Sequence, residues 1–163
     1  MAPMAREMGH AVPLTADEEA FLRAFLRALV TVPRALDGDL MTSHGVSLTD
    51  YVGLMHLSEA PGHTLRIGDL ANMCALSLSG TTRIVSRLEE QGLLRREQSA
   101  SDARGWEAVL TGSGLAHLRR AWPSHLASVR RHIIDQLDDV DLPPITAAVS
   151  GFAGGSPQDG PQA

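Results

Sequence analysis

Two arginines four residues apart, Arg83 and Arg87, are the side chains whose type and spacing most clearly suggest chemistry. In a helix this spacing places both of them on one face. Small polar residues share that face: Ser79, Gly80, Thr82 and Ser86. A guanidinium can donate paired hydrogen bonds to a phosphate or to the edge of a guanine. The face therefore suits contact with a nucleic acid, although an ordinary solvated helix face would carry the same residue types.

The other face of this helix is suited to packing. Residues with that role recur at three- and four-residue steps: Thr81, Ile84, Val85 and Leu88. Ser77 has the residue type and the place of an N-cap, and Gly92 is a C-terminal signal, so we predict a helix that runs to about Gln91. Short side chains in its first turn would let the helix enter a groove, where hydroxyls and free backbone amides can bind phosphate.

The segments around this helix predict a winged helix-turn-helix. A short helix over residues 66–74 precedes it, and two strands over residues 93–98 and 106–110 follow it, joined by a small polar loop. A short helix, a turn, a second helix and a two-stranded hairpin make up this motif. Its second helix enters the major groove of DNA, and the hairpin reaches the adjacent minor groove or backbone.

The hairpin loop carries Asp102 and Arg104. An arginine at a hairpin tip is the side chain that a narrow, electronegative minor groove attracts. Asp102 is negative, so it would act by pairing with a neighbouring arginine and shaping the loop. The alternative is a surface turn with an incidental ion pair, which contributes little energy.

The segment before these elements predicts two further helices. Apolar residues at three- and four-residue steps predict a first helix over about residues 16–42, which Pro33 should kink or end. Ser47 followed by Asp50 is a capping-box pattern, so a short buried helix should start there.

The segment after the hairpin predicts two more. Thr111 is placed to cap a long helix whose apolar residues follow near-heptad steps from Leu115 to Leu137. Pro143 suits the first turn of a last helix that reaches about Phe152.

The predicted fold class is mainly α with a small β-hairpin wing. We expect one domain over residues 16–152, preceded by a flexible leader and followed by a disordered tail. The expected parts are a leader over 1–15, dimerisation helices over about 16–42 and 112–152, a DNA-binding lobe over about 47–111, and a tail over 153–163.

The net charge of −5 does not by itself suggest a nucleic-acid-binding protein. From Ser77 to Trp106, however, the sequence contains five arginines and four acidic residues, which gives a local net charge of +1. We expect modest non-specific affinity for DNA that falls steeply with salt. All 14 basic residues are arginines, which a genome rich in G and C would also produce.

Composition excludes several classes of protein. Hydrophobic residues make up 44% of the chain, too many for a disordered protein, yet no run is long enough to span a bilayer. The first ten residues lack the apolar stretch of a signal peptide, and a single cysteine, Cys74, cannot form an intrachain disulfide. A cytoplasmic protein with no membrane partner is the expectation.

The run from Ile67 to Leu94, IGDLANMCALSLSGTTRIVSRLEEQGLL, resembles the helix-turn-helix of the multiple antibiotic resistance regulator (MarR) family. Asp102-Ala103-Arg104-Gly105 followed by Leu110-Thr111 resembles the wing signature of that family, and Ser47 to Tyr51 resembles the start of its second helix. The resemblance covers roughly residues 16–152, and the wing motif is its more specific part.

The resemblance implies a two-fold dimer held by the N- and C-terminal helices and bound to a pseudopalindromic operator in double-stranded DNA. It implies a repressor that a small-molecule or redox signal controls. It assigns DNA contacts to Ser79, Thr82, Arg83 and Arg87 on the helix and to Asp102 and Arg104 in the wing. Gly80 departs from the family pattern, in which a side-chain donor is common, so one contact is in doubt there.

Other sites have weaker support. His44, Met55, His56 and Trp106 are candidates to line an effector pocket between the dimer helices and the DNA lobe. The seven histidines show no metal-ligand spacing, no nucleophile elbow or Walker loop is present, and Cys74 suits a buried structural thiol. We therefore expect no cofactor, no metal and no enzymatic activity. A winged-helix scaffold that binds protein or ligand but no DNA is the alternative function.

Overall fold

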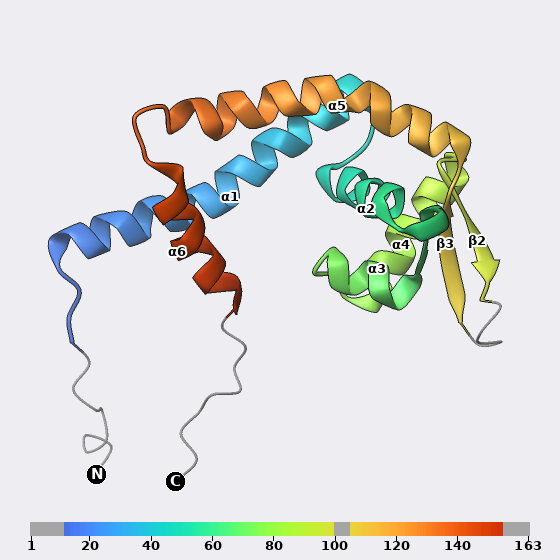
Figure 1. Cartoon of the computed structure of the whole chain (residues 1–163), viewed down its shortest axis with the longest axis horizontal. Coiled ribbons are helices and arrows are strands. Elements are labelled where there is room, and N and C mark those ends of the chain that lie inside the picture. The colour runs from blue at the N-terminus through green and yellow to red at the C-terminus, as the bar shows by residue number, and fades with distance from the viewer. Residues whose placement is uncertain (1–11, 100–104, 155–163) are drawn as a thin grey trace, which may run out of the picture.

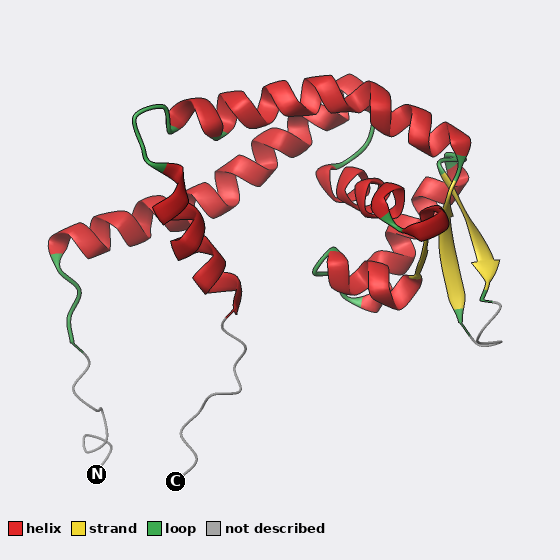
Figure 2. Cartoon of the chain, in the orientation of Figure 1, coloured by secondary structure: helices red, strands yellow, loops and turns green. Residues whose placement is uncertain are grey.

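The computed structural model describes residues 12–99 and 105–154, and it is helical apart from one small sheet (Figures 1 and 2). The helices are α1 (Ala16–His44), α2 (Leu48–Glu59), α3 (Ile67–Met73), α4 (Leu78–Glu90), α5 (Gly112–His132) and α6 (Leu142–Gly154). The strands are β1 (Thr64–Arg66), β2 (Leu94–Gln98) and β3 (Trp106–Leu110). Single 3-10 turns lie at Pro61–His63 and Ile134–Gln136. The predicted fold class is confirmed.

The predicted caps are present. Thr111 accepts a hydrogen bond from the amide of Gly114, and Ser77 accepts one from the amide of Gly80. Ser47 and Asp50 form a complete capping box at the start of α2. These bonds satisfy amides that a helix N-terminus leaves without partners, which explains why the starts of these helices could be predicted closely.

The sheet has three strands rather than the two that the sequence predicted. β3 is central and pairs antiparallel with β2 on one side and with β1 on the other, with Leu65 opposite Ala108. Residues 64–66 are too few for a periodic pattern, so β1 was missed; the short helix accordingly begins at Ile67 rather than Arg66.

The core lies in the lobe formed by α2, α3, α4 and the sheet, where α5 begins. Its fully buried members include Tyr51, Leu54, Leu57, Leu70, Val85, Leu88 and Leu94. Leu40 of α1 and Leu118 of α5 join the same cluster. The two long helices are therefore fixed to the lobe at one end by apolar packing.

α1 and α5 run side by side along the top of the molecule, and α6 folds back across α1 at the end remote from the lobe (Figure 1). The first helix, predicted over about residues 16–42, is present as α1, which continues through Pro33 to His44; there Gly45 adopts a left-handed conformation (φ 69°) and its amide bonds the carbonyl of Met41. Leu29 and Pro33 are both exposed, so water can satisfy the carbonyl that lacks a proline N–H partner.

The end of α5 differs from the prediction. The helix ends at His132, because Ile133 leaves helical geometry (φ −129°, ψ −67°), so the apolar steps predicted up to Leu137 extend past the helix. α6 contains Pro143 in its first turn, as predicted, and runs to Gly154. The predicted leader and tail lie largely outside the described residues.

Candidate nucleic-acid interface

The candidate contact residues lie on the solvent-facing side of α4, most of them near its N-terminus. Thr81, Ile84, Val85 and Leu88 are buried as predicted, which leaves the other side exposed. Ser77, Ser79, Thr82 and Arg83 are exposed, and Gly80 is half-buried. The N-cap and first turns of α4 thus bring five of the seven predicted helix residues together on one surface. The other two, half-buried Ser86 and exposed Arg87, follow further along the helix.

Hydroxyl groups on this surface are already used as donors. Thr82 Oγ1 donates to the carbonyl of Leu78 at 2.9 Å, and Ser86 Oγ donates to the carbonyl of Thr82 at 3.0 Å. Ser79 and Ser77 share a hydrogen bond of 3.2 Å between their hydroxyls. The lone pairs of Thr82 remain outward-facing acceptors, whereas a bond to phosphate would require this hydroxyl to rotate away from Leu78.

Arg83 and Arg87, which were predicted to play the same role, differ in their partners in the structure. Arg83 is exposed and has no ion-pair partner among the described residues. Arg87 donates from Nη2 to Asp50 Oδ1 at 2.5 Å and from Nε to Asp50 Oδ2 at 3.2 Å. Its side chain is 47% exposed, and that of Asp50 is 3% exposed. The hydrogen bonds that Arg87 donates to Asp50 raise the pKa of Arg87.

β2 is fastened to α4 by a second ion pair. Arg96 donates from Nε to Glu89 Oε2 at 2.7 Å, its amide donates to Glu89 Oε1 at 3.0 Å, and its Nη2 donates to Ser86 Oγ at 3.1 Å. These hydrogen bonds lower the pKa of Glu89. Arg95 pairs with Glu97 on the exposed side of β2. Most of the positive charge that the sequence places in this lobe is therefore compensated by neighbouring carboxylates.

A cavity of about 500 Å³ adjoins the exposed end of α4. It is lined by Arg66, Ile67, Gly68, Asp69, Leu78, Thr82, Gly105 and Trp106. Leu78 is 61% exposed and Trp106 is 54% exposed. Leu78 was not among the predicted site residues, although an apolar residue at the start of α4 that lies outside the buried face was a usable signal.

The predicted wing contacts, Asp102 and Arg104, lie outside the described residues. The strands that carry them are well formed: Gln98 pairs with Trp106, and the amide of Ser99 donates to the carbonyl of Gly105 at 2.9 Å. The hairpin therefore starts its loop beside the cavity at α4.

The four residues suggested for an effector pocket are not brought together. Trp106 lines the cavity beside α4, whereas His44 bonds Ser124 of α5 (Nε2 to Oγ, 2.6 Å) and packs edge-on against His117. Met55 packs against the lobe core, and His56 is partly buried on the same helix. A smaller cavity of about 270 Å³ lies between α1 and α5, next to His44, and is lined by Asp39, Leu40, Ser43, Ser124, His125, Ala127, Ser128 and Arg131.

Two half-buried histidines of α5, His117 and His125, should make stability depend on pH. Partial burial lowers the pKa of His125, whose ring packs at a tilt against that of Tyr51 with 4.4 Å between ring centroids, and it lowers the pKa of His117. The unfolded chain then binds more protons than the folded one below about pH 6.5, so stability should fall as the pH drops through that value and stay level above it.

We expect the urea midpoint to be lower at pH 5.5 than at pH 7.5. His125→Phe should reduce this fall, because a phenylalanine ring can pack against Tyr51 without titrating. Urea titrations of both proteins at the two pH values measure the difference. His63→Phe, at an exposed position, is the control and should leave the fall unchanged. A fall of equal size in His125→Phe and the wild type would contradict the assignment.

The remaining candidates add no reactive group. Cys74 packs against the core, and burial raises the pKa of its thiol. Within residues 12–99 and 105–154, no three His, Cys, Asp or Glu side chains are arranged to hold a metal ion. In the same part of the chain, no helix combines the length and apolar character needed to cross a membrane.

Comparison with known proteins adds independent evidence. Residues 44–105 match the family model described as the MarR family. The chain is 38% identical to AbsC, a MarR family transcriptional regulator from Streptomyces coelicolor, with a TM-score of 0.81 over 88% of this chain and 96% of that one. It is 33% identical to Sco3205 from the same organism, a MarR family regulator solved in complex with DNA, with a TM-score of 0.81 over 92% and 96%.

Curated relatives agree over a shorter segment. The chain is 32% identical over 77 residues to the HTH-type transcriptional repressor Rv2887 of Mycobacterium tuberculosis. That alignment covers 47% of this chain and 54% of the repressor, so the chain spans about half the length of the curated relatives it matches.

Proposed function

The chain belongs to the MarR family of transcriptional regulators, and from that premise we propose that it represses transcription by binding a pseudopalindromic DNA operator as a homodimer, until a small effector releases it. The observation that carries the proposal is the exposed N-terminal half of α4, with Arg83 unpaired within the described chain. Two such helices about 34 Å apart would enter successive major grooves.

A homodimer is supported by apolar surface that a monomer leaves exposed. On α1 these residues are Phe21, Leu22, Leu26, Leu29 and Val30, and on α6 they are Val149 and Phe152. The ring of Phe152 contacts that of Phe25, so the two helices present one continuous apolar surface. Contiguous surfaces of this kind mark protein–protein interfaces.

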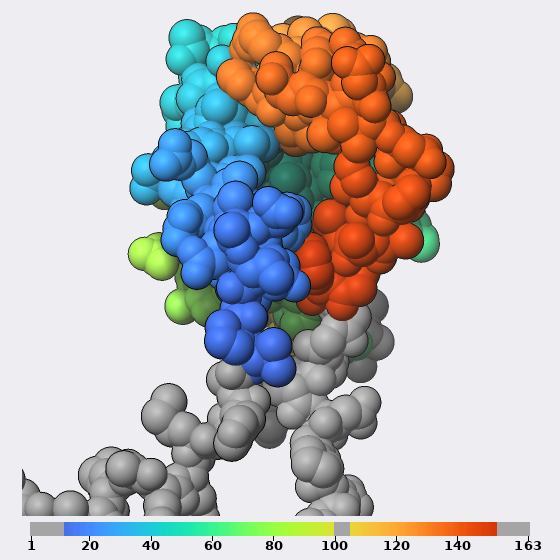
Figure 3. Space-filling model, turned by 90° about the vertical axis from the view of Figure 1, so that its left-hand side faces the viewer, coloured from blue at the N-terminus to red at the C-terminus, as the bar shows by residue number. Residues whose placement is uncertain are grey.

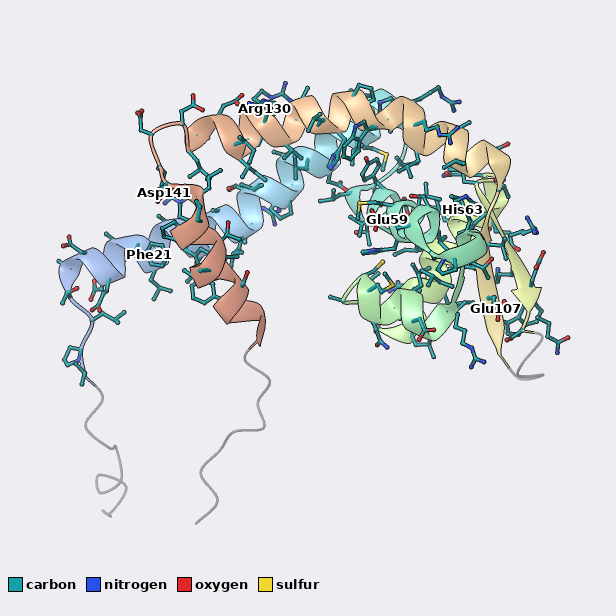
Figure 4. The ribbon with its side chains drawn as sticks, in the orientation of Figure 1. Phe21, Glu59, His63, Glu107, Arg130 and Asp141 are labelled. Carbon is teal, nitrogen blue, oxygen red and sulfur yellow. The ribbon has the colours of Figure 1, made fainter. Side chains whose placement is uncertain are left out.

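This surface is separate from the DNA lobe. Figure 3 shows α1 on one side and the end of α5 with α6 on the other, around a hollow in front of the lobe. In Figure 4, Phe21 lies at the α1–α6 end of the molecule and Glu107 lies at the sheet, far across the ribbon. A partner could therefore cover the apolar surface and leave both copies of α4 free for DNA.

Repression is supported by the curated relatives, which are named transcriptional repressors. The cavity between α1 and α5 is a better candidate for the effector site than the cavity beside α4, because α1 and α5 both run from the apolar surface to the lobe. A ligand that binds there can release DNA only if it favours a lobe spacing that misses successive grooves.

The test is a fluorescence anisotropy titration against the DNA upstream of the protein's own gene, in a salt series, with random DNA as the reference. The proposal would be supported by specific binding in which the logarithm of the association constant falls linearly with the logarithm of the salt concentration. A folded dimer that binds neither DNA would instead favour the winged-helix scaffold without DNA binding. The pairing of Arg87, Arg95 and Arg96 with carboxylates is the observation that favours this alternative.

We expect Arg83→Ala to weaken operator binding by about 10–100-fold, because a paired contact from arginine to a base is worth roughly 1–3 kcal/mol. The melting temperature should not change, since Arg83 is exposed and unpaired within the described chain. Arg119→Ala, which removes an exposed arginine from α5, is the matched control and should bind as the wild type does. Equal affinities of Arg83→Ala and Arg119→Ala would exclude Arg83 from the interface.

A further inference from the structure

The carboxylate of Asp50 lies where three helices are joined by polar contacts. Its Oδ2 accepts the amide of Ser47 at 3.1 Å and Nε of Arg87 at 3.2 Å, and its Oδ1 accepts Nη2 of Arg87 at 2.5 Å. One residue after Ser47, the amide of Leu48 donates to Oδ1 of Asp37 in α1 at 2.8 Å. A continuous set of hydrogen bonds thus runs from α1 through the first turn of α2 to α4.

Burial of Asp50 makes the centre of this set resistant to opening. Asp50 is 2% exposed, and Arg87 is the cation that compensates its charge. A buried carboxylate without its partner is strongly destabilising, so the pair cannot open cheaply. A bidentate pair also fixes the plane of the guanidinium and not merely its distance. The helix that carries Arg87 is therefore held at a set angle to α2.

The same geometry weakens Arg87 as a direct DNA contact. Two of its donor groups point at Asp50, and a negative carboxylate within hydrogen-bond distance offsets the attraction of the guanidinium for phosphate. Arg83, one turn earlier on α4, has no such partner among the described residues. Glu89 with Arg96 holds the later part of α4 to β2 in the same way.

We propose that Arg87 is a positioning residue, which together with Asp50 sets the angle at which α4 presents Arg83 and the first-turn hydroxyls to DNA. This rests on the proposed DNA-binding function. It replaces the contact role that the family resemblance implies for Arg87 by a role inside the protein. Since Asp37 lies on α1, which carries the apolar surface, the same set of bonds connects the proposed dimer interface to α4.

A double-mutant cycle in the full chain separates the two roles. Asp50→Asn keeps the shape and the capping acceptor but removes the charge, and Arg87→Gln removes the guanidinium. If Arg87 positions α4, each single variant weakens operator binding about tenfold, the double variant is no weaker than the worse single variant, and the salt slope is unchanged. If Arg87 contacts phosphate, Asp50→Asn binds as well as the wild type or better, and Arg87→Gln lowers the salt slope by about 0.9 for each half-site.

A second measurement needs no DNA and so stands even if the wild type fails to bind an operator. We expect amide hydrogen exchange in α4 of the free protein to rise at least tenfold in Asp50→Asn and in Arg87→Lys, which keeps the charge but loses the bidentate geometry. Glu97→Gln, which breaks the exposed pair with Arg95, is the control and should leave α4 unchanged. Wild-type exchange in both variants, with melting temperatures confirming the fold, would overturn the proposal.

Discussion

Leu26→Glu should convert the proposed homodimer into monomers and weaken operator binding by at least 100-fold. Leu26 is 54% exposed in the single chain and lies among the apolar residues of α1. A partner that covers this surface would bury the new carboxylate without a counter-charge, which is strongly unfavourable. Once the copies separate, binding of the second half-site is no longer intramolecular, and linked sites of this kind gain a factor of 10² to 10⁴.

Light scattering after size-exclusion chromatography measures the mass, and anisotropy measures the affinity. Ala24→Glu is the matched control, because Ala24 is exposed on the opposite side of the same helix and receives the same charge. Circular dichroism should show unchanged helix content in both variants. If Leu26→Glu remains a dimer with full affinity, the interface lies elsewhere and the role proposed for the α1–α6 surface is wrong.

The order of elements was predictable because local rules dominate in this chain. The hydroxyl caps at Ser47, Ser77 and Thr111 satisfy amides within three residues of themselves, so their signal is contained in the local sequence. The buried face of α4 follows from periodicity in the same way. β1 could not be found so easily, since residues 64–66 become a strand only by pairing with β3, more than forty positions later.

The candidate site was predictable in outline and not in detail for the same reason. Spacing placed Arg83 and Arg87 on one face, but it carried no information about Asp50, thirty-seven positions earlier, which binds Arg87. Charge counting gave a balance of +1 without showing which charges compensate one another. The pairing of Arg96 with Glu89 likewise arises only when β2 packs beside α4.

These pairings change how a weakly basic lobe can recognise DNA. Arg87 and Arg96 hold α4 and β2 in place through their ion pairs with Asp50 and Glu89. The paired carboxylates, together with screening by salt, largely cancel the electric field of these arginines at the distance of a Debye length. Affinity must then come from few uncompensated groups that are accurately placed, with Arg83 foremost among those described. A protein built in this way should bind random DNA weakly, which favours discrimination between an operator and the rest of the genome.

Accurate placement also depends on the corner where α5 meets the lobe, and Gly114→Ala should damage it severely. Gly114 is buried, and a Cβ atom there would lie 2.0 Å from the carbonyl oxygen of Leu93 and 2.7 Å from Leu110 Cδ1. The backbone cannot move freely, because Thr111 bonds the carbonyls of Gly92 and Leu93 at 2.8 and 3.0 Å. Overpacking of this kind costs about 3 kcal/mol, equivalent to a melting temperature roughly 6–12 °C lower.

Gly112→Ala is the matched control for this prediction, since the same methyl group is added two residues earlier in the same helix. No described atom outside the helix backbone and the adjoining residues lies within 4 Å of the place that a Cβ atom would take there. The melting temperature should therefore stay level or rise, as alanine favours the helix over glycine. Differential scanning calorimetry of the two variants measures the contrast. Equal melting temperatures would mean that α5 can shift away from the lobe, and the angle between α5 and α4 would then not be fixed by this corner.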